Sequence, residues 1–282
     1  MVELLNGKEL ADRIKLEVKA EVEELKANGK DVTLAVIQVG ADPASSTYVK
    51  NKQKACKYCG IKSVAYKLEH NVSEEYLIDL ITMLNSETRI DGILVQLPLP
   101  EHIDEYKVIQ SIAPEKDVDG FNEINVGKLM IGEKTFVPCT TAGIIELLKA
   151  NGVEIEGNNC VVVGRSNIVG KPTAIELLKN NATVTICHSK TRNLMDICYC
   201  ADILICAVGK PKFFNRKYIS SGTVVVDVGI HRQEDGTLCG DVDFDDVKDI
   251  VDAITPVPGG CGAMTVAMLM KNCVQAAKKR SE

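Results

Sequence analysis

The feature that most constrains the fold is residues 159–170, which read NCVVVGRSNIVG. A short apolar run ends at Gly164, a polar turn follows, and Gly170 leads into Lys171-Pro172, with proline at an early helical position. Strand, turn and helix in this order predict a phosphate-binding site, because the first helical turn has free N–H groups and the positive end of the dipole. The spacing is Gly-x-Ser-x-x-x-Gly, so an ordinary strand-to-helix turn remains the alternative.

The sequence after this motif predicts which dinucleotide would bind. Residues 182–187 form a second β-type run, which completes a βαβ unit. A NAD-binding fold usually carries an acidic residue at the end of this strand, whereas residues 188–192 here read HSKTR. Cations and hydroxyls suit a 2′-phosphate, so NADP is favoured over NAD, and Arg165 is a further candidate for that phosphate.

The composition indicates an ordinary globular chain of one large or two smaller domains. It has 282 residues, 45% of them hydrophobic and 26% charged. The net charge of −6 argues against a nucleic-acid partner or an anionic membrane surface. The sequence has no apolar run of the roughly 18 residues that a membrane span needs and no hydrophobic signal core at its start, so a cytoplasmic location is expected.

The cysteines suggest neither disulfides nor a metal site. The chain has eleven, an odd number, and many lie inside apolar runs. We therefore expect reduced, buried thiols. Cys56-x-x-Cys59 has no second pair at zinc-site spacing, and the four histidines are dispersed, so no metal is predicted.

Alternating β-type and helical segments predict an α/β fold. In the first half we expect strands at 34–39, 63–68 and 92–97 and helices at 8–28, 46–59, 74–85 and 104–112. In the second half we expect a Rossmann-type sheet from strands at 159–163, 182–187, 202–208 and 223–228, with a last helix at 264–279. Thr140 or Thr141 is expected to cap a helix that runs to Ala150.

The helix at 46–59 places one lysine on an unusual face. At 100° per residue Tyr48 and Lys52 share a stripe with Ala55, Cys56 and Cys59, opposite a face of exposed lysines. Desolvation would lower the pKa of the Lys52 amine and allow it to act as a base or nucleophile. A lysine that reaches solvent along its stem is an equally good interpretation.

Several polar residues lie where strands end. Gln96 is the polar member of an apolar run near the carboxyl end of a strand, where α/β sheets bind ligands, so it is a candidate partner for Lys52 or substrate. An edge-strand residue that points at water is the alternative interpretation. Acidic turns at Asp117 and Asp241 lack the EF-hand pattern, because position twelve after the first is Lys128 and position six of the second is Asp246. Asp117 and Asp119 beside Gly120 suggest a ligand-facing loop, and the alternative interpretation of both turns is that their carboxylates are simply solvated.

Seven stretches, taken together and in order, resemble the bifunctional methylenetetrahydrofolate dehydrogenase/methenyltetrahydrofolate cyclohydrolase (FolD) family. They are YVKNK at 48–52, GILVQLP at 92–98, PEKDVDG at 114–120, PCT at 138–140, VVGRSNIVG at 162–170, CHSKT at 187–191 and TPVPGG at 255–260. The resemblance implies two α/β domains around a cleft, the second a Rossmann-type NADP-binding domain, with the C-terminal helix returning to the first. It assigns residues 1–120 with 255–282 to folate binding and residues 121–254 to NADP, and it implies a homodimer.

The resemblance also assigns roles to individual residues. Lys52 would be the catalytic lysine, with Tyr48 beside the folate, Gln96 as the hydrogen-bond partner of Lys52, and Asp119 on the pterin edge. The remaining folate-binding residues would be Ser45, Leu97, Pro258 and Gly259. NADP would be bound by Gly164, Arg165, Ser166, His188, Ser189 and Ile230.

The implied chemistry is oxidation of 5,10-methylenetetrahydrofolate by NADP⁺, followed by hydrolysis of the methenyl product to 10-formyltetrahydrofolate. Two departures from the family pattern are Thr141 and Ala263, where the family commonly has proline. A different NADP-dependent dehydrogenase, acting on a small amino or hydroxy acid, and a non-catalytic nucleotide sensor are the alternatives. Arg13 and Arg89 are the only arginines of residues 1–120, so a dehydrogenase of that kind lacks a convincing anion anchor there.

Overall fold

Two separate parallel β-sheets organise the chain, each in its own structural unit. The computed structural model describes residues 2–280. The small-sheet unit consists of residues 12–137 and 266–280, and the large-sheet unit consists of residues 2–11 and 138–265. Helices α1 (Gly7–Ala27) and α10 (Cys261–Lys279) contribute residues to both units. These units reflect packing alone, so the expected folate-binding and NADP-binding boundaries stay a prediction.

The small-sheet unit contains strands β2 (Thr33–Val39), β3 (Lys62–Leu68) and β4 (Gly92–Val95) in the order β3-β2-β4, all parallel. Every residue of the central strand β2 is buried, as a parallel strand covered on both faces requires. The strand expected at 92–97 ends at Val95. Gln96 N still donates to Ile37 O at 2.9 Å, but Pro98 has no N–H group with which to continue the pairing.

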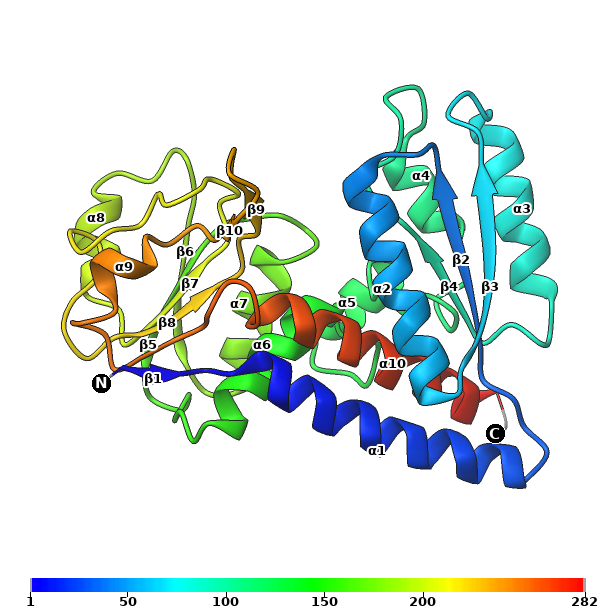
Figure 1. Ribbon diagram of the computed structural model, residues 1–282, viewed down its shortest axis with the longest axis horizontal. Coiled ribbons are helices and arrows are strands. Elements are labelled where there is room, and N and C mark those ends of the chain that lie inside the picture. Colours follow the sequence, from blue (N-terminus) through cyan, green and yellow to red (C-terminus); the bar gives the residue numbers. More distant parts are fainter. Residues whose placement is uncertain (1, 281–282) are drawn as a thin grey trace. The chain divides into compact units, whose positions relative to one another are not determined.

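The helices of this unit are α2 (Pro43–Cys59), α3 (Glu74–Ser86), α4 (Glu105–Ser111) and α5 (Glu123–Met130), together with most of α1 and α10. Local signals set their ends. Asp42 caps α2 by accepting from Ser45 N, Gly60 ends α2 with a φ of 77°, and Ser73 caps α3. Helices α3 and α4 cover one face of the sheet through a shared apolar core with β2 and β4 (Figure 1).

The large-sheet unit contains six parallel strands in the order β1-β11-β8-β7-β5-β6. They are β1 (Glu3–Leu4), β5 (Asn159–Val163), β6 (Thr183–Cys187), β7 (Ile203–Cys206), β8 (Val224–Asp227) and β11 (Ala253–Ile254). A hairpin of β9 (His231–Arg232) and β10 (Leu238–Cys239) follows β8. The predicted Rossmann-type sheet and the two-domain α/β fold are confirmed.

Helices α6 (Cys139–Ala150) and α7 (Gly170–Lys179) pack together, while α8 (Leu194–Tyr199) and α9 (Phe244–Val247) join the apolar core on the sheet (Figure 1). The expected cap of α6 at Thr140 or Thr141 is wrong, because the helix begins at Cys139 after Pro138. The two hydroxyls bond elsewhere: Thr140 to Thr265 at 3.1 Å and Thr141 to Thr173 at 3.0 Å.

The C-terminal helix returns to the small-sheet unit, as the resemblance implies. Lys278 in its last turn pairs with Glu21 of α1 at 2.5 Å. Asn272 Nδ2, buried in the middle of α10, donates to Val118 O at 2.8 Å. The helix therefore stabilises the loop that follows α4 and contains Asp119, a predicted folate-binding residue.

Candidate active site

A hydrogen bond joins Lys52 on α2 to Gln96 after β4. Lys52 Nζ donates to Gln96 Oε1 at 3.1 Å, and Gln96 Nε2 donates to Leu97 O at 2.7 Å. Because the amide N–H₂ group is engaged by Leu97, the amide oxygen faces the lysine. Lys52 is half-buried, whereas Lys50 and Lys54 on the same helix are exposed. The helical pattern that set Lys52 apart from its neighbouring lysines is thus reproduced.

The first turns of α2 carry two further predicted site residues. Ser45 is buried and Tyr48 is 40% exposed. Gln38 was not predicted as a site residue; it is a buried amide in β2, and its Nε2 donates to Ser46 Oγ at 2.8 Å. This bond ties the start of α2 to the central strand and so fixes the helix that carries Lys52. The available signal was a lone polar residue in an apolar run, the same signal that identified Gln96.

The loop after α4 is built around Asp117, which is 1% exposed. Its carboxylate accepts from Gly120 N at 3.1 Å and from Asn122 N and Asn125 Nδ2 at 2.8 Å each. The interpretation of Asp117 as a solvated turn carboxylate is therefore wrong: it satisfies the polar groups of its own loop, and burial raises its pKa. Asp119, two residues on, is half-buried.

Lys116, the residue before Asp117, caps the carboxyl end of α3. Its Nζ donates to Leu84 O at 2.9 Å, Asn85 O at 2.7 Å and Glu87 O at 2.8 Å. A cation suits the end of a helix, where carbonyl groups lack intrahelical partners. Burial lowers the pKa of this amine, while the nearby Asp91 carboxylate raises it in part. Asp117 and Lys116 together hold both sides of the loop.

In the large-sheet unit, the glycines of the first motif are required by close backbone contacts. A Cβ atom at Gly170 would lie 2.2 Å from Gly164 O, and one at Gly164 would lie 2.4 Å from Ala207 O. Ser166 Oγ accepts from Val169 N at 3.2 Å and Gly170 N at 3.3 Å. The predicted strand–turn–helix is confirmed, and the tightly folded turn leads directly into α7.

A second turn lies beside the first, because Gly164 N donates to Cys187 O at 2.9 Å. In this turn His188 N donates to Thr191 Oγ1 at 2.8 Å, and Lys190 N donates to His188 Nδ1 at 3.1 Å. The cationic and hydroxyl-bearing residues that are exposed on these turns are Arg165, Ser166, Ser189, Lys190 and Arg192. Guanidinium, ammonium and hydroxyl groups therefore gather at the carboxyl ends of β5 and β6, a composition suited to phosphate.

Asp241 and Asp227 organise the ends of β7 and β8. Asp241 is fully buried and its carboxylate accepts from Val208 N at 2.6 Å and Gly209 N at 3.0 Å. Its interpretation as a solvated turn residue is wrong for the same reason as that of Asp117. Burial raises the pKa of the neighbouring Asp227 from its ordinary 3.8 to about 6.

Three predicted residues lie after β8 and β11. Ile230 is 39% exposed, and its Cδ1 would lie 2.8 Å from a Cβ atom at Gly262. Gly259 O accepts from Lys8 N at 2.8 Å, and Pro258 follows a cis peptide bond. These residues belong to the large-sheet unit with the predicted NADP-binding residues, whereas Ser45, Tyr48, Lys52, Gln96, Leu97 and Asp119 all belong to the small-sheet unit.

Two family models account for most of the chain. Residues 5–119 match the catalytic domain of tetrahydrofolate dehydrogenase/cyclohydrolase, and residues 138–281 match its NAD(P)-binding domain. The chain belongs to this family. It is 61% identical over 279 residues to the bifunctional protein FolD of Lachnoclostridium phytofermentans, with 99% of each chain covered.

Solved structures of this family have the same fold. The bifunctional FolD of Campylobacter jejuni is 48% identical with a TM-score of 0.98, and the match covers 99% of this chain and 100% of that one. The Trypanosoma brucei enzyme, solved with NADP and an inhibitor, is 38% identical with a TM-score of 0.95, covering 100% of this chain and 99% of that one. The alternative of an amino- or hydroxy-acid dehydrogenase therefore lacks support.

The cysteines of this family member carry free thiols throughout the described residues. Burial raises the pKa of Cys56 to about 12 and that of Cys59 to about 11, so both thiols are protonated near neutral pH.

Within residues 2–280 no cluster of three His, Cys, Asp or Glu side chains could hold a metal ion. None of the described helices is both long and apolar enough to cross a membrane.

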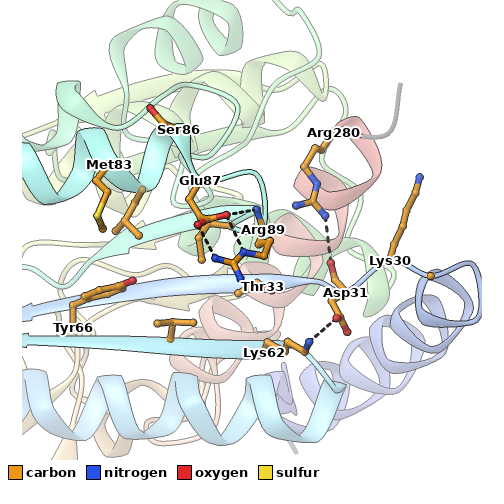
Figure 2. A pocket seen from close by; sticks show the side chains of 14 residues that line it. Lys30, Asp31, Thr33, Lys62, Tyr66, Met83, Ser86, Glu87, Arg89 and Arg280 are labelled. Carbon is orange, nitrogen blue, oxygen red and sulfur yellow. Dashed lines mark hydrogen bonds and ion pairs between the residues drawn. The ribbon is translucent and has the colours of Figure 1, made fainter.

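A pocket of about 740 Å³ lies elsewhere in the small-sheet unit, at the amino ends of β2 and β3. None of the predicted site residues lines it. Figure 2 shows two ion pairs among its charged side chains, Lys62 with Asp31 and Arg89 with Glu87, at distances of 2.5 Å and 2.9 Å. The family's ligands are expected at the other end of the sheet, where Gln96 follows β4.

Proposed function

We propose that this chain is a bifunctional enzyme of folate one-carbon metabolism. It oxidises 5,10-methylenetetrahydrofolate with NADP⁺ and then hydrolyses the resulting 5,10-methenyl cation to 10-formyltetrahydrofolate. The observation that carries the proposal is the Lys52–Gln96 hydrogen bond of 3.1 Å, inside the segment that matches the family's catalytic domain. It supplies a positioned amine where the second reaction needs a proton acceptor.

In the hydrolytic step, the oxygen of a water molecule bonds to the methenyl carbon and the Lys52 amine takes the proton that the water loses. The hydroxyl proton of the adduct then passes to folate N5 as the carbon–N5 bond breaks, which leaves the formyl group on N10. Lys52 finally releases its proton to solvent, so the step balances. Gln96 holds Nζ in place, and Tyr48, one turn earlier on α2, orients the folate beside the amine.

Folate is bound by Ser45, Tyr48, Lys52, Gln96, Leu97 and Asp119 of the small-sheet unit, together with Pro258 and Gly259. The Asp119 carboxylate accepts from the amino and ring N–H groups of the pterin edge, and the Asp117 network fixes the loop that presents it. Residues 1–120 with 255–282 form the folate-binding domain and residues 121–254 the NADP-binding domain.

NADP is held by the turns after β5, β6 and β8, through Gly164, Arg165, Ser166, His188, Ser189 and Ile230. The structure fits a bound dinucleotide, because exposed cationic and hydroxyl side chains gather on these turns and a Cβ atom at Gly209 would meet no atom within 4 Å. When bound, NADP⁺ supplies the hydride acceptor of the first reaction. Arg165 and Ser189 contact the 2′-phosphate.

The enzyme acts as a homodimer in the cytoplasm, with no nucleic-acid or membrane partner. Strand β6 is one edge of the large sheet, and exposed apolar side chains lie before, on and after it: Leu178, Ile186, Met195 and Tyr199. Pairing of such an edge with a second copy would cover them. Sedimentation equilibrium tests this proposal: Ile186→Glu should halve the mass of the wild-type particle, and a monomeric wild type would contradict it.

The deciding experiment compares Lys52→Met with Lys54→Met, a matched change of an exposed lysine on the same helix. Each protein is mixed with methylenetetrahydrofolate and NADP⁺, and NADPH and the methenyl chromophore are followed separately. Lys52→Met should accumulate the methenyl compound and lose cyclohydrolase activity at least 100-fold while staying folded, as a lost general base predicts. Hydrolysis at the wild-type rate would refute the assigned role.

A further inference from the structure

The Asp241 carboxylate is saturated with hydrogen-bond donors. Its Oδ2 accepts from Val208 N at 2.6 Å and Gly209 N at 3.0 Å, and its Oδ1 accepts from Lys210 N at 2.9 Å and His231 Nε2 at 2.8 Å. The side chain is fully buried. Four donors use the whole acceptor capacity of one carboxylate, so the side chain belongs to the protein's own framework.

Three of these donors lie at the switch point of the large sheet. The chain passes from β5 to β6 on one side, and β7 then pairs with β5 on the other. Ligands of open α/β sheets bind outside the carboxyl ends of the strands at such a point. Residues 208–210 are the segment that leaves β7 there, and Ala207 O is the atom that a Cβ atom at Gly164 would meet at 2.4 Å.

The fourth donor connects this segment to the end of β8. His231 opens the β9–β10 hairpin, and β10 returns the chain to Asp241. Asp227, the last residue of β8, accepts from Asp241 N and Val242 N at 2.9 Å each. The packing leaves no space for side chains: a Cβ atom at Gly229 would lie 2.4 Å from Asp241 Oδ1.

We propose that Asp241 is a positioning residue for the dinucleotide: by binding the N–H groups of residues 208–210 and His231 Nε2, it fixes the two strand-end segments that flank the cofactor. The inference rests on the proposed NADP site. The carboxylate binds three backbone N–H groups, which are therefore not available to a ligand in the crevice. A Cβ atom at Gly209 would meet no atom within 4 Å, so a ligand can approach the backbone closely there. Preorganisation of this kind lowers the cost of binding a ligand.

Asp241→Asn is the direct test. The amide keeps one oxygen but turns an N–H₂ group toward two donors, so two of the four hydrogen bonds are lost. We expect the KM for NADP⁺ to rise at least tenfold, with the KM for methylenetetrahydrofolate changed less than twofold. Hydrolysis of methenyltetrahydrofolate uses no dinucleotide, so the rate of that reaction should also change less than twofold. A purely structural role would lower both activities together.

A second variant covers the case in which Asp241→Asn does not fold. His231→Ala removes one donor and leaves the three backbone bonds, and we expect a two- to fivefold rise in the KM for NADP⁺ alone. Asp117→Asn is the matched control, since Asp117 is an equally buried loop carboxylate of the small-sheet unit. It should raise the KM for folate and leave that for NADP⁺ unchanged; a similar NADP⁺ effect would overturn the inference.

Arg165→Ala separates this inference from the proposed cofactor site. If Arg165→Ala raises the KM for NADP⁺ while Asp241→Asn and His231→Ala leave it unchanged, the positioning role is refuted and the cofactor site stands. If none of the three changes this KM, the cofactor site itself is wrong. Parallel loss of cyclohydrolase and dehydrogenase activity in folded Asp241→Asn would also refute the positioning role.

Discussion

Asp227 provides a stability prediction whose size follows from the structure. Its carboxyl is buried and accepts from Asp241 N and Val242 N, which follow β10, and its folded-state pKa is about 6 against an ordinary 3.8. The folded chain therefore keeps a proton that the unfolded chain releases. This stabilisation is fully present below about pH 4 and is lost as the pH rises through about 6. A shift of about 2 pKa units corresponds to about 3 kcal/mol in total.

Asp227→Asn removes this titration. Between about pH 4 and about pH 7 we expect the free energy of unfolding of wild type to fall by about 2 kcal/mol relative to that of the variant. This is less than the total of about 3 kcal/mol, because at about pH 4 the Asp227 carboxyl is already partly ionised in the unfolded chain. The variant itself is less stable at every pH, because its N–H₂ group faces backbone donors such as Val242 N.

Hydrogen exchange of the β8 amides measures this difference in the unit that contains Asp227, so a separate transition of the other unit does not interfere. Other titrating groups, among them Asp117, whose pKa burial raises, and Glu87, whose pKa Arg89 lowers to about 2, are common to both proteins and cancel. Exchange of the β2 amides is the internal control and should not depend on the variant. A wild-type-minus-variant difference that is flat over this range would refute the buried, protonated carboxyl.

Three further changes test the supports of the two sites. Lys116→Met removes three hydrogen bonds to the end of α3 and should destabilise the small-sheet unit by about 2–3 kcal/mol in urea, whereas Lys107→Met, which breaks an exposed ion pair, should have a much smaller effect. Gly170→Ala places a Cβ atom 2.2 Å from Gly164 O and should weaken NADP⁺ binding in calorimetry; Gly127→Ala, which meets open space, is the control. Arg165→Ala should raise the KM for NADP⁺ more than that for NAD⁺ in initial-rate assays, and equal changes would argue against contact with the 2′-phosphate.

Local patterns predicted most of the framework. The apolar runs at β2 and β5 and the glycine motif of residues 159–170 are short-range signals, and each corresponds to an observed element. The separation of Lys52 from the exposed lysines of α2 also follows from helical periodicity. Its pairing with Gln96 spans 44 residues and came partly from the position of Gln96 at a strand end. The roles of both residues rest on the family resemblance.

Interactions between distant residues account for what was missed. The prediction of a threonine cap for α6 was wrong, because the helix begins directly after Pro138 and the hydroxyls of Thr140 and Thr141 bond to residues far along the chain. Gln38 carried the same signal as Gln96, a lone polar residue in an apolar run, but nothing in the sequence indicated its partner Ser46 on the next helix. No local pattern reports such partners, so these assignments required the folded structure.

The two acidic turns show that an aspartate in a polar turn can be buried in the folded chain. An aspartate in a polar turn is usually solvated, yet Asp117 and Asp241 are both buried because several N–H groups converge on each carboxylate. Once these N–H groups are buried they cannot donate to water, and the carboxylate accepts their hydrogen bonds instead. Each aspartate lies in a loop beside a proposed binding site, one for folate and one for NADP. The same device therefore stiffens a ligand-facing loop in each unit, so substituting either aspartate should affect the ligand of its own unit and spare the other.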